Sequence, residues 1–234
     1  MDNTEEQLEM ESLRQYACKM TWNPNTASLD VRLKDEAYAE PRRKHKPAPH
    51  HPERFQVPAQ IMSREGLSSR HFFQVEWFGR WATIGMAYKH ISRKGSVEAC
   101  TIGCNENSWG IFVSTPYPIC KALHGGVETN LPDSSPFRVG VYLDWPAGIL
   151  SFYNTTHNEA KLIHTFHEKF TSSLFLLVSI SAGIQVLPDN PPPVCFHDHD
   201  PWGIMMVEEA CNGCRDSKKE SKVVPSRSSR CVII

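Results

Sequence analysis

The last four residues, Cys231, Val232, Ile233 and Ile234, carry the clearest chemical signal in the chain. A cysteine followed by two aliphatic residues and one final residue is the C-a-a-X pattern, in which an isoprenoid alkylates the thiol. A bulky aliphatic last residue is nearer to the leucine and phenylalanine class, which favours geranylgeranyl over farnesyl. We therefore expect Cys231 to be prenylated, the alternative being a tail that fits the pattern by accident.

Basic residues precede this cysteine. A single lipid chain gives reversible attachment to a bilayer, and each base near an anionic leaflet adds about 1 kcal/mol. The bases that could act as this second signal are Lys218, Lys219, Lys222, Arg227 and Arg230. Cys211 and Cys214 are candidate palmitoylation sites. We expect 188–234 to be a flexible basic tail that holds the protein at the cytosolic face of the plasma membrane or an endomembrane.

Histidines and cysteines in the same region raise the question of a metal or catalytic site. Cys195, His197 and His199 precede Cys211 and Cys214, and Zn²⁺ accepts such nitrogen and sulfur ligands. Their spacing fits no established zinc module, so we expect polar linker side chains and no bound metal. The sequence has no G-x-S-x-G, P-loop or H-E-x-x-H motif, and we expect neither an enzyme nor a cofactor.

Composition narrows the class further. The formal net charge is −1 and 40% of the residues are hydrophobic, so nothing in the overall balance attracts nucleic acid. The longest apolar run is 174–178, far shorter than the roughly 20 residues of a spanning helix. The acidic N-terminus has no apolar h-region, which argues against a signal peptide, and eight scattered cysteines fit reduced cytosolic thiols.

The elements that must position any site are strands. Val139, Val141 and Leu143 alternate with polar or small residues, which is the period of a strand with one buried face. Many such runs without helical patterns between them predict an all-β, bent antiparallel sandwich of two sheets. The runs are 72–78, 82–88, 109–114, 137–144, 148–154 and 174–180. Residues 41–58, rich in proline and bases, are expected to form a solvated loop, the alternative being an attraction for an anionic partner.

One hairpin, 142–154, is specified in more detail. Pro146 sets φ for a turn and Gly148 can adopt the positive φ that bulged hairpin loops require. Such a turn places Trp145 near the rim of the sheet, either exposed for recognition or covered by a neighbouring loop.

Four ordered motifs resemble the PRY–SPRY domain of TRIM-family proteins and butyrophilins. The hairpin is similar to the family's LD-x-x-AG-x-LSFY signature through Leu143, Asp144, Ala147, Gly148, Leu150, Ser151, Phe152 and Tyr153. The segments 22–28, 52–55 with 68–77, and 102–112 resemble the other three. The resemblance implies a two-sheet sandwich over 21–187 whose loops bind another protein. In or beside these loops lie the candidate partner-binding residues Trp81, Trp109, Lys121, His124 and Trp145, with core packing as the alternative reading.

The N-terminal residues 1–20 form a separate element. Met10, Leu13, Ala17 and Met20 repeat at helical spacing, which predicts a short amphipathic helix over 4–20. The helix either docks on its own domain or is a remnant of a coiled coil. We expect a membrane-anchored SPRY adaptor. The alternative is a substrate-recognition partner recruited through this helix to a TRIM-type ubiquitin ligase, since the chain itself shows no RING or B-box pattern.

Overall fold

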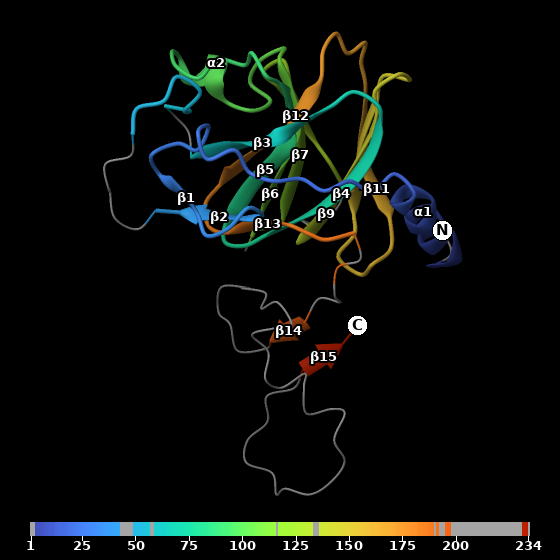
Figure 1. Ribbon diagram of the computed structural model, residues 1–234. Helices are drawn as coiled ribbons and strands as arrows, with labels where there is room; N and C mark the ends of the chain where they lie inside the picture. The colour runs from blue at the N-terminus through green and yellow to red at the C-terminus, as the bar shows by residue number, and fades with distance from the viewer. Residues whose placement is uncertain are drawn as a thin grey trace, which may run out of the picture.

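The computed structural model describes residues 3–42, 49–56, 59–115, 117–132, 136–189, 191, 195–197 and 231–233. Two antiparallel sheets face each other as a sandwich, which confirms the predicted all-β class (Figure 1). The larger sheet contains, in spatial order, β1 (Val31–Leu33), β2 (Tyr38–Pro41), β13 (Ile184–Val186), β4 (Arg70–Trp77), β9 (Arg138–Asp144), β10 (Ile149–Asn154) and β11 (Lys161–His167). The smaller contains β3 (Gln60–Leu67), β12 (Leu174–Ile180), β5 (Trp81–Tyr88), β6 (Ser108–Ser114), β7 (Ile119–His124) and β8 (Val127–Asn130).

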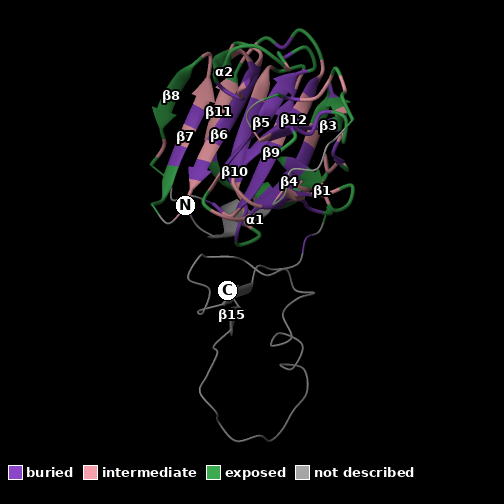
Figure 2. Ribbon diagram, turned by 90° about the vertical axis from the view of Figure 1, so that its left-hand side faces the viewer, coloured by how far each residue is buried: buried purple, intermediate pink, exposed green. Residues whose placement is uncertain are grey.

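The core lies between the sheets because the central strands alternate as predicted. Val139, Val141 and Leu143 of β9 are fully buried, and the central strands of both sheets are purple in Figure 2. The six predicted runs correspond to β4, β5, β6, β9, β10 and β12. Among the strands that were not predicted, every residue of β8 is exposed, whereas β3 has eight residues of which five are buried.

The N-terminal helix is shorter than predicted. The helix α1 (Asn3–Arg14) ends six residues before Met20, because the chain then joins the edge of a strand. The backbone N–H of Cys18 donates to the Phe72 carbonyl at 2.9 Å, and the N–H of Phe72 donates to the Tyr16 carbonyl at 2.8 Å. The expectation that Ala17 and Met20 continue the helical stripe is therefore wrong.

The apolar face of α1 is docked on the sandwich. Met10 and Leu13 are buried against Phe72, Tyr153 and Ala160 on the outer face of the larger sheet. Among the two open interpretations of this helix, docking on its own domain is the arrangement that the structure has. A second, four-residue helix, α2 (Val97–Cys100), follows β5.

Most of the predicted tail lies outside the described residues. This holds for Cys211, Cys214 and the basic residues 218–230, and also for 43–48 in the basic loop. The backbone of β14 (Cys195–His197) pairs with β15 (Cys231–Ile233) in a separate two-stranded sheet. Within the described part of the chain, no helix has the length and apolar character needed to cross a bilayer.

Candidate functional site

The β9–β10 turn, residues 144–148, is fixed by local hydrogen bonds. The N–H of Ala147 donates to Asp144 Oδ1 at 3.1 Å, and the N–H of Gly148 donates to the Trp145 carbonyl at 3.2 Å. Gly148 has φ +71°, and a Cβ there would lie 2.3 Å from the carbonyl oxygen of Glu168. Glycine is therefore required both for the turn and for the close approach of the β11–β12 connection. Asp144 also accepts a hydrogen bond from Arg70 Nε at 2.7 Å.

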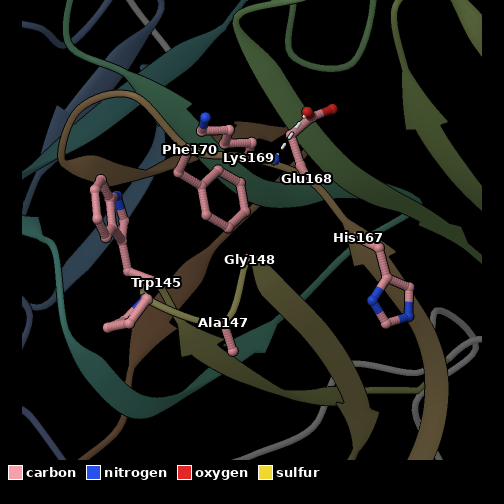
Figure 3. A pocket seen from close by; sticks show the side chains of 8 residues that line it. Trp145, Ala147, Gly148, His167, Glu168, Lys169 and Phe170 are labelled. Carbon is pink, nitrogen blue, oxygen red and sulfur yellow. Dashed lines mark hydrogen bonds between the residues drawn. The ribbon is translucent and has the colours of Figure 1, made fainter.

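A hollow of about 500 Å³ lies between this turn and the β11–β12 connection. It is lined by Trp145, Pro146, Ala147, Gly148, His167, Glu168, Lys169 and Phe170, and we call it the rim hollow. Trp145 is half-buried, and its indole Nε1 donates to the Ser172 carbonyl at 3.0 Å. In Figure 3, Trp145 and Phe170 lie near each other, whereas the ring of His167 points away from them. The sequence left open whether Trp145 is exposed for recognition or covered by a neighbouring loop. In the structure the side chain is partly covered by the core and by its hydrogen bond to Ser172, and partly exposed in the rim hollow.

An aromatic stack supports the rim hollow from the core. Phe170 is 5% exposed and meets Trp109 edge to face, with ring centroids 5.4 Å apart. Trp109 also meets Tyr88 edge to face at 5.2 Å. Because Trp109 is only 2% exposed, it offers no surface to a partner. Its proposed role as a direct contact is corrected to core packing beneath the rim.

His124 connects this stack to two carboxylates. Its ring lies over Trp109 with centroids 4.8 Å apart. Its Nδ1 is 2.9 Å from the Ser108 carbonyl, which can only accept, so Nδ1 carries a proton. Its Nε2 is 3.5 Å from Glu106 Oε2 and 3.9 Å from Glu168 Oε2. The half-buried ring is therefore held close to Glu168, one of the residues that line the rim hollow.

The other two candidates lie elsewhere. Trp81 stacks on Phe112 at 6.2 Å, and Phe112 is paired across strands with Lys121. Lys121 Nζ is 2.7 Å from Glu128 Oε2. Since Trp81 and Lys121 lie on strands of the smaller sheet with side chains away from the core, the five candidates separate into a rim group and a sheet-face group.

The second wall of the rim hollow, residues 167–170, was not among the residues predicted from the sequence. Residues 167–170 belong to no quoted motif, and no feature of their types marks them out. Their neighbour His164 has its pKa lowered, first by burial and then by the nearby His167, and its ring contacts Phe166 at 4.5 Å. Both effects favour the neutral form of His164 at this end of β11.

Comparison with known proteins finds relatives that share one domain with this chain. Residues 70–187 match the sequence profile of the SPRY domain. The chain is 36% identical over 165 residues to stonustoxin subunit beta of Synanceia horrida, covering 70% of this chain and 23% of the subunit. It is 32% identical over 188 residues to tripartite motif-containing protein 14 of Mus musculus, covering 75% of this chain and 40% of that protein. The chain thus spans less than half the length of either relative.

Solved structures agree with the sequence matches. The stonustoxin structure aligns with a TM-score of 0.70 at 32% identity, covering 76% of this chain and 30% of that chain. The crystal structure of the TRIM65 PSpry domain aligns with a TM-score of 0.69 at 22% identity, covering 76% of this chain and 94% of that chain, which shows the shared fold. The resemblance first seen in four short motifs is confirmed, and the chain belongs to the SPRY domain family.

Proposed function

We propose that this chain is a non-enzymatic adaptor that binds another protein through the rim hollow and is held at a membrane by a prenyl group on Cys231. The SPRY domain is a protein-interaction module in tripartite-motif proteins. The observation that carries the binding part is the hollow of about 500 Å³ between two rigid connections, with Trp145 on its wall and Phe170 at its base.

The chemistry of the rim hollow suits a protein partner. Aromatic side chains supply large contact area at low entropic cost, and here Trp145 is already held by its bond to Ser172. Glu168 and Lys169 place charges of both signs at the edge, which favours a mixed polar rim around an apolar anchor. A partner would insert one bulky apolar side chain between Trp145 and Phe170.

Replacing Trp145 by alanine is expected to remove the binding. A central aromatic contact contributes about 2 kcal/mol or more, which corresponds to an affinity loss of roughly thirtyfold. Proximity labelling in cells, compared between wild type and Trp145→Ala, measures the effect on the set of labelled proteins. Trp81→Ala, on the outer face of the smaller sheet, is the matched control and should leave that set unchanged. If only Trp81→Ala lost the labelled proteins, the binding surface would be the outer face of the smaller sheet and not the rim hollow.

Replacing Cys231 by serine is expected to release the protein from membranes. The support is the C-a-a-X pattern and the bases before it, since a serine hydroxyl accepts no prenyl group in thioether linkage. Fractionation of cell lysates measures the change from the membrane pellet to the supernatant. Cys104→Ser, at an exposed cysteine of the sandwich, is the control and should stay in the pellet. An unmodified C-terminal peptide in mass spectrometry of native protein would contradict the anchor.

Recruitment to a ubiquitin ligase through the N-terminal helix is less well supported. Met10 and Leu13, which would form the pairing face, are buried against Phe72 and Tyr153. Pairing with another helix would require α1 to leave the sandwich and expose these side chains. We therefore favour binding through the rim hollow.

A further inference from the structure

A second concave surface lies far from the rim, on the side of the sandwich formed by β1, β2 and residues 49–56. It consists of two adjoining hollows of about 380 and 320 Å³ that share Pro49, His51 and Arg54. The first is also lined by Leu29, His50, Phe55, Gln56 and Lys94, and the second by Pro24, Asn25, Ala27, Val31, Arg32, Leu33 and Arg42. We call the two together the basic groove. None of its lining residues contributes to the rim hollow.

The lining of the basic groove is cationic. Its described lining includes arginines, a lysine and two histidines but no carboxylate. Of the nearby acids, Glu40 pairs with Arg32 of the groove and with Lys34, and Glu53 lies 3.7 Å from Lys89 Nζ. Within the described residues, Arg42, Arg54 and Lys94 have no carboxylate within 4.0 Å. Among the described residues, no ion pair therefore neutralises the charges of Arg42, Arg54 and Lys94.

Two of these cations are fixed in place by backbone carbonyls. Arg54 donates through Nη1 to Ala27 and through Nη2 to the Pro49 carbonyl at 3.0 Å. Arg42 donates through Nη2 to the Val31 carbonyl at 3.5 Å. The Nε of each guanidinium is buried without a hydrogen-bond partner among the described residues. Neutral carbonyls orient these guanidinium groups but do not neutralise their charge.

The groove also has an apolar floor. Leu29 is 48% exposed, one of the few large aliphatic side chains so open in the described part of the chain. It lines the first hollow together with Phe55, which is fully buried and holds Arg93 4.3 Å above its ring. A free phosphate or a metal chelate would leave this floor uncovered. An apolar side chain flanked by acids would cover the floor and meet the charges together.

We propose that the basic groove binds an extended acidic segment of another protein, with one aliphatic side chain on Leu29 and its carboxylates facing Arg42, Arg54 and Lys94. The chain's own acidic N-terminal residues do not fill this role, because α1 is docked through Met10 and Leu13 elsewhere on the sandwich (Figure 1). The adaptor would thus have two separate contacts, and this one stands independently of the rim hollow.

The test is a binding titration on the full chain with a fluorescein-labelled peptide of alternating glutamate and leucine. Arg42→Glu/Lys94→Glu should weaken binding by about tenfold or more, because two attractive charges become repulsive. Lys19→Glu/Lys161→Glu changes the net charge equally away from the groove, Lys161 lying on β11 at the opposite edge of the larger sheet from β1, and should stay within about twofold of wild type. Leu29→Ser should also weaken the glutamate–leucine peptide, whereas a glutamate–serine peptide should bind weakly to every variant. Arg54 is left unchanged because it holds two loops.

Three results would overturn the proposal. The first is the absence of saturable binding below about 1 mM peptide, a level at which association is worth only about 4 kcal/mol. The second is an equal loss in both double variants, which would mean attraction by net charge alone. The third is full competition by inorganic phosphate with no effect of Leu29→Ser, which would indicate a small-anion site. Proximity labelling of Trp145→Ala tests only the rim hollow, and the peptide titration tests only the basic groove. The two proposals can therefore fail separately.

Discussion

Replacing Arg138 by methionine should lower the free energy of unfolding by about 3–5 kcal/mol, since it leaves a buried carboxylate without its partner. Arg138 is 2% exposed and Glu76 is 4% exposed. The two face each other across β4 and β9, with Arg138 Nη2 3.7 Å from Glu76 Oε1. Burial raises the pKa of Glu76, and the charge of Arg138 opposes that rise in part. Without Arg138, only the effect of burial acts on the Glu76 carboxyl, and its pKa should rise further.

The pH dependence distinguishes this cause from lost packing. A carboxyl whose folded pKa lies above its unfolded value stabilises the protein at low pH, and this contribution is lost as the pH rises through the folded pKa. The difference between Arg138→Met and wild type should therefore be smallest near the ordinary glutamate pKa of about 4.5 and grow toward neutral pH. Urea unfolding at several pH values measures it.

A second substitution provides the control. Glu76→Gln removes the charge that Arg138→Met leaves unpaired, so the double variant should recover most of the lost stability. An equal cost of Arg138→Met with and without Glu76→Gln, at every pH, would show that the two residues are not energetically coupled.

The central strands could be predicted because their residues alternate between core-facing apolar positions and positions that face away from the core. In β9, Val139, Val141 and Leu143 face the core and the intervening positions do not, so periodicity alone located the strand. The strand β8 has no buried residue, and β11 lies at a sheet edge with mixed burial, so neither has that periodicity. Helix α1 was predicted too long because hydrogen bonds between Tyr16, Cys18 and Phe72 end it, and these depend on tertiary contact.

The candidate site could be predicted only in part for a related reason. Pro146 and Gly148 specify a turn through their own backbone preferences, so the position of Trp145 followed from local chemistry. The opposite wall, Glu168 to Phe170, is brought there by strand pairing about twenty residues farther along the chain. Lys94 and Leu29 likewise meet Arg54 only in the folded chain, although the basic character of 41–58 was visible in the sequence.

Trp109 supports the rim hollow from beneath, so its replacement by alanine should lower the free energy of unfolding by about 3–5 kcal/mol and also weaken partner binding. Alanine would leave a cavity against Tyr88 and Phe170 and remove the surface on which the His124 ring stacks. Chemical unfolding measures the first effect, and the proximity-labelling comparison used for Trp145 measures the second.

Replacement by phenylalanine gives the sharper test, with Trp22 as the matched control. Both tryptophans are buried, but Trp22 Nε1 donates to the Ala37 carbonyl at 2.7 Å, whereas Trp109 Nε1 has no hydrogen-bond partner among the described residues. An unsatisfied buried donor costs about 1–3 kcal/mol. Removing the Nε1–H of Trp109 therefore regains stability, which offsets part of the stability lost when the smaller phenylalanine ring packs less well. In Trp22→Phe the change instead removes a buried hydrogen bond, since the Ala37 carbonyl keeps only the one from the Val186 N–H at 3.0 Å. We therefore expect Trp22→Phe to destabilise the protein more than Trp109→Phe by at least about 1 kcal/mol, and the reverse order would show that Trp109 Nε1 is satisfied in solution.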